Sequence, residues 1–205
     1  MARRNDHSRE QIQDMAIQAA ITILNREGVA GLSTRKVARA IGYTAGTLYL
    51  VFKNLDELIL HINAATLDEL HKQLAAQLDR ESTPAQVIKN MALTYMKFAK
   101  ANYARWSLLF THRLPAGQAV PEWLDDKIRQ LFGLVGQPLN ELLPAFDAQA
   151  CMCAIRVLWS GVHGACELGL NDKLSLGGEV STEELINSLV ENYLKGLVTQ
   201  EGGAC

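Results

Sequence analysis

The amino-acid sequence predicts an all-α protein. Apolar residues recur with the 3.6-residue period of amphipathic helices along almost the whole chain. No segment shows the sustained alternation of apolar and polar residues that would indicate strands between turns. The chain has 205 residues, of which 48% are hydrophobic and 20% charged, so it can bury a core and has room for one ordinary domain or two small ones.

Three helices are predicted in the N-terminal quarter of the chain. Ser8 with Gln11 three residues later forms a capping box that begins a helix of about twenty residues. Ser33 can cap a second, shorter helix that ends near residue 41, and Thr44 can cap a short third one. Two capped helices separated by a short turn follow the first, which is the order of elements in a helix-turn-helix motif.

A long fourth helix is predicted to connect two domains. Asn54 and Glu57 form a second capping box, and a helix over residues 55–79 would be about 37 Å long at 1.5 Å per residue. We therefore expect two domains, one over residues 1–54 and a larger helical one over residues 55–205. Further helices are predicted over residues 84–101, 103–112, 121–143, 147–170 and 182–198. The last two have more apolar face than one subunit usually covers, which favours a homodimer.

The charge of the chain is divided unevenly. Residues 1–53 carry eight Lys/Arg and four Asp/Glu, a net charge of +4, and the remaining twelve Lys/Arg and eighteen Asp/Glu give −6. The basic N-terminal quarter favours an anionic partner, of which nucleic acid is the commonest, and a solvated basic face is the alternative.

The segment from Gly31 to Leu58 carries the predicted function. In a helix-turn-helix, the short second helix places its first turn at base edges in the major groove, and the helix before it meets the phosphate backbone. Leu48 and Phe52, four residues apart, are expected in the core, which leaves Tyr49 exposed. The predicted DNA-binding residues are Thr34, Arg35, Lys36, Thr44, Ala45, Gly46, Thr47, Tyr49 and Lys53.

Residues 8–60 resemble the tetracycline-repressor (TetR/AcrR) family of bacterial transcriptional regulators. The residues that carry this resemblance are Gly31, Thr34, Arg35, Val37, Ala38, Gly42, Gly46, Thr47, Leu48, Tyr49, Phe52, Lys53, Asn54, Glu57 and Leu58. The resemblance implies a DNA-binding domain over residues 1–54 and a ligand-binding and dimerisation domain over residues 55–205. It implies a homodimer that represses transcription from a palindromic operator in double-stranded DNA and is released by a small-molecule effector. It also implies that Thr34 and Arg35 contact backbone or base, and that Tyr49 and Lys53 contact phosphates.

Two positions depart from the family pattern. Val51 stands where a His or Tyr often contacts a phosphate, and Leu55 stands where a Lys usually begins the fourth helix. Fewer phosphate contacts predict a shallower salt dependence of DNA binding. Arg3, Arg4 and Arg9 offer a compensating basic arm, and an idle terminus is the alternative.

The second domain carries a local resemblance to the WHG type of C-terminal domain in the same family. Trp159, Gly161, His163 and Gly164 form this pattern, and Trp159 and His163 lie on one helical face. A pocket wall with one polar group and an ordinary core histidine are both open interpretations. The predicted ligand-binding residues are Phe98, Trp106, Phe110, Met152, Trp159 and His163. They favour an apolar or aromatic ligand with a polar handle, although the same residues would also fill a helical interior.

Other functions have weaker signals. Cys151 and Cys153 point to nearly opposite sides of a helix, and His163 with Cys166 supplies at most two ligands, so neither a metal site nor a cofactor is expected. Buried inert cysteines are favoured over a redox switch. A helical enzyme built around His163, Cys166 and Glu167 lacks any recognised catalytic pattern, so the chain is not expected to be an enzyme. A ligand-independent architectural or cell-division-type DNA-binding protein of the same fold stays open.

The sequence also bears on location. No apolar run reaches the roughly 18 residues of a membrane helix, and the N-terminus is polar where a signal peptide would be apolar. We therefore expect a cytoplasmic protein with no membrane partner.

Overall fold

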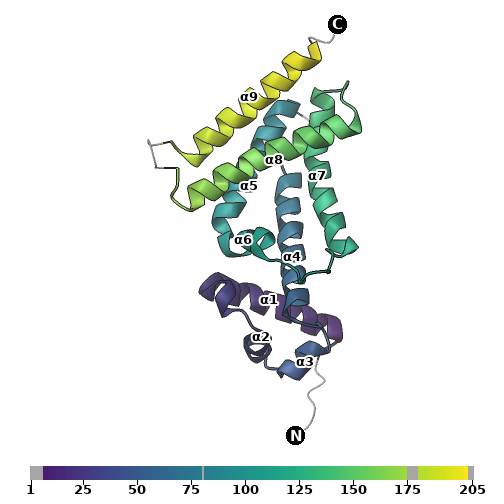
Figure 1. The fold of residues 1–205 in the computed structure, drawn as a ribbon, viewed down its shortest axis with the longest axis vertical. Helices are drawn as coiled ribbons and strands as arrows, with labels where there is room; N and C mark the ends of the chain where they lie inside the picture. Colours follow the sequence, from purple (N-terminus) through teal and green to yellow (C-terminus); the bar gives the residue numbers. More distant parts are fainter. Residues whose placement is uncertain (1–6, 80, 175–179, 203–205) are drawn as a thin grey trace. The chain divides into compact units, whose positions relative to one another are not determined.

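A computed structural model describes residues 7–79, 81–174 and 180–202. Over these residues the fold is all-α, as predicted, with nine α-helices, one 3₁₀ helix and no strand (Figure 1). The elements are α1 Arg9–Glu27, η1 Val29–Gly31, α2 Thr34–Ala40, α3 Ala45–Tyr49, α4 Leu55–Ala75, α5 Pro84–Ala101, α6 Tyr103–Thr111, α7 Glu122–Leu142, α8 Ala148–Leu170 and α9 Thr182–Gly202. Arg3 and Arg4, for which a basic arm was predicted, lie outside the described residues, as do the predicted loop 175–178 and Cys205.

The predicted caps begin the N-terminal helices. The Ser8 hydroxyl accepts from the Gln11 backbone N–H at 3.2 Å, and the Gln11 side chain accepts from the Ser8 N–H at 2.7 Å, which completes the capping box. Ser33 and Thr44 cap α2 and α3 in the same way, each at 3.3 Å. Gly28 ends α1 with a φ of 69°, a left-handed conformation that glycine adopts without strain.

Three features of the helices differ from the prediction. The last helix, α9, ends at Gly202, four residues beyond the predicted end at 198. The 3₁₀ turn η1 was not predicted, because three residues carry no helical period. The long fourth helix ends at Ala75, four residues before the predicted end at 79. Past its end, i→i+3 backbone bonds replace the α-helical pattern, and the Asp79 carboxylate accepts hydrogen bonds from the Glu81 N–H and the Ser82 hydroxyl. Such local side-chain bonds offer the backbone an alternative to continuing the helix.

The chain forms two compact units. The first comprises the residues up to Thr66 together with Asn102–Leu124, and the second comprises Leu67–Ala101 and the residues from Asp125 onward. The first unit therefore holds α1 to α3, the beginning of α4 and all of α6. The functional boundary between residues 54 and 55 stays a prediction.

The core of the first unit joins α1, α2, α3, α4 and α6. Its largest buried side chains include Leu24, Leu48, Phe52 and Leu58, and Leu108 of α6 belongs to the same cluster. The first unit therefore includes α6, a helix from much later in the chain than α1 to α4.

A side-chain hydrogen bond also joins the residue after α6 to α4 within the first unit. His112 follows α6, and its Nε2 lies 2.9 Å from Oδ1 of Asp56 in the first turn of α4. The His112 side chain is only 10% exposed, so this contact is largely shielded from water.

The second unit packs α5, α8 and α9 against one another (Figure 1). Glycines allow α8 and α9 to approach closely: a Cβ added at Gly169 would lie 3.2 Å from the Thr182 Cβ, and one at Gly161 would lie 2.6 Å from the Leu189 Cδ2. These small residues bring the two helix backbones together, as close helix packing requires.

Candidate DNA-binding interface and effector cavity

The short helix α3 presents one exposed aromatic side chain. Leu48 and Phe52 are 0% and 1% exposed, as predicted, whereas Tyr49 is 55% exposed. Because neighbouring residues of a helix point in directions 100° apart, burial of Leu48 and Phe52 turns Tyr49 outward. The helix is anchored by apolar contacts on one side and open to a partner on the other.

Hydrogen bonds order the hydroxyl groups around α3. The Tyr49 hydroxyl lies 3.3 Å from Oγ1 of Thr34, the first residue of α2. The Thr44 hydroxyl lies 3.2 Å from that of Thr47 and also caps the helix. Thr34 begins α2 and Thr44 caps α3, so these two hydroxyls lie where free backbone N–H groups favour phosphates, whereas Tyr49 is the last residue of α3.

Three predicted cations accompany these hydroxyls. Arg35 and Lys36 are exposed in the first turn of α2, and Lys53 is exposed just after α3. Lys36 is engaged by Glu27, with Nζ 2.5 Å from Oε2, so binding a phosphate would exchange one anion for another. Ala45 and Gly46, also predicted, stand in the first turn of α3 and keep that surface small.

Arg39 is a further exposed cation that the prediction did not include. It lies in the last turn of α2, one turn beyond Arg35. The signal was present in the sequence, because Arg39 follows Arg35 by four residues and therefore shares its helical face.

The two departures from the family pattern are apolar in the fold as well. Val51 is buried in the core of the first unit, and Leu55 packs against that core. The Arg9 guanidinium lies 3.5 Å from the Val51 carbonyl oxygen, which places one cation of the predicted arm beside this position.

The second unit contains an apolar cavity of about 60 Å³. Its walls come from α4, α5, α7 and α8. The lining residues are Leu74, Ile88, Met91, Ala92, Tyr95, Leu131, Phe132, Val135, Ile155, Leu158, Trp159 and Val162. The residues from α5 and α8 are mostly buried, whereas the three from α7 are half-buried, so the cavity is more accessible along α7.

One edge of the cavity is polar. The Tyr95 hydroxyl lies 2.9 Å from Nδ1 of His163, and the His163 ring stacks on Trp159 with ring centres 5.4 Å apart. Burial lowers the pKa of His163 below its ordinary value, and the charge of Glu167 opposes that shift to a smaller extent. A neutral imidazole therefore stands behind the cavity wall at neutral pH.

The six predicted ligand-binding residues are distributed unevenly. Trp159 lines the cavity, and His163 contacts both Trp159 and Tyr95 of its wall. Phe98 is buried in α5 outside the lining, and Met152 is 40% exposed. Trp106 and Phe110 belong to the first unit, where their rings pack edge to face with centres 5.5 Å apart.

Tyr95 lines the cavity but is not among the six predicted ligand-binding residues. It follows Ile88 and Met91 on the buried face of α5, and this spacing marks it as a core residue. Only the long-range contact with His163 distinguishes Tyr95 from an ordinary core residue.

The cysteines of the described residues are free thiols. Cys151 and Cys166 are buried and Cys153 is exposed. Burial raises the pKa of Cys166 to about 12 and raises that of Cys151. Across the part of the chain that the structure describes, no three His, Cys, Asp or Glu residues gather as metal ligands, and no helix is long and apolar enough to span a membrane.

These features define a helix-turn-helix protein with a helical second domain, and two family models match the chain. The model of bacterial regulatory proteins of the tetR family matches residues 16–62, and the tetracyclin repressor-like C-terminal domain model matches residues 88–193. The chain belongs to the TetR family, whose members are transcriptional regulators and not enzymes.

Curated relatives match parts of the chain. The HTH-type transcriptional regulator Mb1846 of Mycobacterium bovis is 30% identical over 122 residues, which is 56% of this chain and 50% of the relative. The tetracycline repressor protein class E of Escherichia coli is 34% identical over 84 residues, 41% of this chain and 39% of the relative. The nucleoid occlusion factor SlmA of Actinobacillus pleuropneumoniae is 26% identical over 103 residues, 50% of this chain and 51% of the relative. The chain spans about half the length, or less, of these curated relatives.

Solved structures share the fold over nearly the whole chain. A Rhodococcus sp. RHA1 protein of unknown function superposes with a TM-score of 0.78 at 18% identity, covering 96% of this chain and 100% of that one. The transcriptional regulator FadR from Bacillus subtilis, in complex with stearoyl-CoA, has a TM-score of 0.68 at 14% identity, with 89% and 98% covered. At these identities the likeness shows the fold alone.

Proposed function

We propose that the chain is a cytoplasmic transcriptional repressor that binds a palindromic operator as a homodimer and leaves it when a small molecule binds the second domain. The observation that carries the DNA-binding part is the exposed face of α3. Tyr49 is exposed at the end of α3, whose neighbours Leu48 and Phe52 are buried, and its hydroxyl bonds to Thr34 of α2, beside the exposed Arg35.

A dimer accounts for the apolar residues left exposed on the last two helices. Val157 and Leu168 of α8 and Val198 of α9 are among the exposed large apolar residues. Two copies paired through such faces would carry two reading helices. With a separation of about 34–36 Å these helices reach successive major grooves on one face of DNA, which is why the operator is expected to be palindromic.

Release requires that the effector distinguish two states of the protein. To reverse the occupancy of the DNA-binding state from 99:1 to 1:99, the effector must prefer the released state by about 10⁴-fold, or about 5.5 kcal/mol. The cavity bounded by α4, α5, α7 and α8 supports this mechanism, because α4 runs from the DNA-binding unit to the cavity wall at Leu74. A ligand that moved α4 would therefore change both the cavity wall and the DNA-binding unit.

Footprinting on the DNA that flanks the protein's own gene tests the proposal. Wild-type protein is expected to protect a palindrome with half-sites one helical turn apart. Tyr49→Ala is expected to abolish protection at the same concentration without changing the far-UV spectrum. Lys100→Ala, which removes an exposed residue of α5 in the second unit, serves as the control. Equal protection by wild type and Tyr49→Ala would refute the assigned surface.

A second candidate function is a ligand-independent DNA-binding protein of architectural or cell-division type. The match to a nucleoid occlusion factor over half of the chain favours it. Such a protein would occupy many chromosomal sites and would not respond to small molecules. Genome-wide footprinting with a thermal-shift screen of metabolites separates the two, because a repressor should give few sites and at least one stabilising compound.

A further inference from the structure

The effector cavity has a chemical character that narrows its ligand. We propose that the cavity takes an uncharged, apolar molecule with a single hydrogen-bonding group, which is read by Tyr95 and His163 after the ligand displaces side chains of α7. This inference rests on the proposed function, since it names the class of effector for the same cavity.

The wall of the cavity excludes charge. Among its twelve lining residues none is ionised at neutral pH, and the only side-chain oxygen is the Tyr95 hydroxyl. A carboxylate or ammonium group buried there would lose its hydration without gaining a counter-ion, which is far more costly than burying a neutral group.

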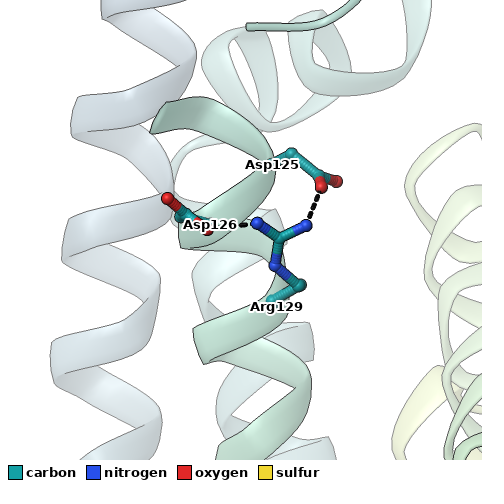
Figure 2. Close-up of polar contacts among 3 residues, drawn as sticks. All are labelled: Asp125, Asp126 and Arg129. Carbon is teal, nitrogen blue, oxygen red and sulfur yellow. Dashed lines mark hydrogen bonds and ion pairs between the residues drawn. The ribbon is translucent and has the colours of Figure 1, made fainter. Parts of the chain in front are cut away.

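Charged residues of the neighbouring helices are held outside the wall. Arg129 of α7 pairs with the carboxylates of Asp125 and Asp126 in the preceding turn (Figure 2). Arg156 of α8 is exposed and lies over the outer part of Phe132, with its guanidinium carbon 5.8 Å from the ring centre. Arg156 is thus the nearest candidate to hold an anionic head group, and the experiment below includes it for that reason.

The Tyr95–His163 pair gives the cavity its one polar recognition element. A phenol hydroxyl both donates and accepts, and the neutral imidazole behind it supplies one donor and one acceptor. A ligand hydroxyl, carbonyl or amide can share this pair without any net charge. His163 also stacks on Trp159, so it contacts two lining residues of the cavity.

The free volume shows that a ligand must open the cavity. The cavity volume is about 60 Å³, whereas occupied ligand pockets measure about 300–1,000 Å³. The most displaceable part of the wall is on α7, whose lining residues Leu131, Phe132 and Val135 are half-buried. Phe132 packs edge to face on Trp159, with ring centres 5.7 Å apart, and would be the first contact to separate.

Three probes that share one ring system test this class. Naphthalene, 1-naphthol and 1-naphthoate differ only in having no polar group, a neutral hydroxyl or an anionic carboxylate. Isothermal titration at pH 7.5 is expected to show 1-naphthol binding at least 100-fold more tightly than 1-naphthoate. Equal affinity for the naphthoate would overturn the proposal. Loss of that affinity in Arg156→Gln would show that the carboxylate pairs with the surface cation.

Two variants test where the probes bind. Tyr95→Phe keeps the ring and removes the hydroxyl, so it should weaken 1-naphthol by about 2- to 10-fold and leave naphthalene within twofold. A merely structural role for Tyr95 would weaken both probes alike and would overturn the assigned recognition. Val135→Phe, at a half-buried position of the wall, should reduce binding of both probes more than 10-fold, and unchanged binding would show that they do not enter this cavity.

The release of DNA is measured separately, by fluorescence anisotropy on the footprinted fragment. A neutral probe that binds in the cavity and leaves DNA affinity unchanged would refute ligand-released repression while the ligand class stands. If a charged compound released DNA equally well from wild type and from Val135→Phe, the proposed ligand class would be refuted, but ligand-released repression would be supported.

Discussion

At the scale of single residues, burial of some side chains in the core determines which side chains the helix-turn-helix exposes to DNA. Leu48 and Phe52 are buried, so Tyr49 is exposed and hydrogen-bonds to Thr34, the first residue of α2. Arg35, next in that helix, is exposed beside this pair. We predict that Arg35→Ala weakens operator binding by about 1–3 kcal/mol and lowers the slope of log K against log salt by about 1, because one phosphate contact is lost.

The salt titration needs two comparisons. Lys100→Ala should keep both the affinity and the slope of the wild type, since it removes a charge from the second unit. If Arg35→Ala lowered affinity at one base pair only and left the slope intact, Arg35 would read a base and not a phosphate.

Burial also sets the reactivity of the thiols. At pH 8 a group whose pKa is about 12 is almost entirely protonated, and Cys166 is fully buried as well. We predict that iodoacetamide alkylates the exposed Cys153 more than 100-fold faster than Cys166 in the native protein. Peptide mass mapping over time measures both rates, and in 6 M guanidinium they should converge. Equal native rates would contradict the burial of Cys166.

His163 should make the stability depend on pH. Burial lowers its folded-state pKa below the ordinary 6.5, so below that pH the unfolded chain binds more protons than the folded one. The free energy of unfolding is therefore expected to fall as the pH drops from 7.5 to 5.5. His61, whose pKa burial also lowers, acts in the same direction.

Urea unfolding of wild type and His163→Gln at both pH values tests this contribution. Glutamine does not titrate, so the variant should lose less stability on acidification than the wild type. A variant with the full wild-type pH dependence would show that His163 takes no part in it.

Helical periodicity predicted some residues of the DNA-binding surface and the cavity but not others. The exposure of Tyr49 and the burial of Leu48 follow from helical periodicity, so they could be predicted. The role of Tyr95 could not, because its partner His163 is 68 residues away and the periodicity of α5 marks Tyr95 only as core. Trp106 and Phe110 were predicted to bind ligand because they are aromatic. They do not line the cavity, because their helix α6 belongs to the first unit.

At the scale of elements, small residues decide how α8 and α9 pack. A Cβ at Gly169 would lie 3.2 Å from the Thr182 Cβ, close to the backbone of α9 and unable to move freely, whereas one at Gly164 meets nothing within 4 Å. We predict that Gly169→Ala destabilises the protein by about 1–3 kcal/mol through overpacking. Gly164→Ala should be neutral or stabilise by up to about 1 kcal/mol, because alanine favours the helix.

Thermal unfolding of these two variants makes a matched comparison. Both changes add one methyl group to the same helix, so helix propensity alone predicts equal gains. If Gly169→Ala were as stable as Gly164→Ala, the close approach at Thr182 would not be limiting.

Element boundaries were predictable where side chains cap helix N-termini, and less so where loop hydrogen bonds or tertiary contacts decide. The capping box of Ser8 and Gln11 is local, and the sequence therefore predicts where α1 begins. The C-terminal end of α4 depends on hydrogen bonds of Asp79, and the placement of α6 depends on Leu108 entering a core made by residues up to 96 positions earlier, Ile12 being the farthest. Neither contact leaves a periodic signal in the sequence.

At the scale of the whole molecule, the uneven distribution of charge matches the proposed functions of the two units, DNA binding and ligand binding. The +4 of residues 1–53 lies in the unit that carries the helix-turn-helix, and the −6 of the rest lies mostly in the unit with the uncharged cavity. Electrostatic attraction to DNA should therefore orient the chain with its first unit toward the duplex.

The dimer proposed above fixes the geometry of the operator. Two reading helices about 34–36 Å apart require half-sites one helical turn apart, so five base pairs inserted between the half-sites would turn the second one to the opposite face of the DNA. The dimer would then hold only one half-site, and the affinity should fall by about 10²-fold or more, because the second contact no longer acts at high effective concentration. Anisotropy titration of the native and the lengthened operator measures this loss, and a single half-site should bind as weakly as the lengthened operator. If the lengthened operator bound as tightly as the native one, each half-site would be occupied by an independent monomer, and the palindrome would no longer require a twofold protein.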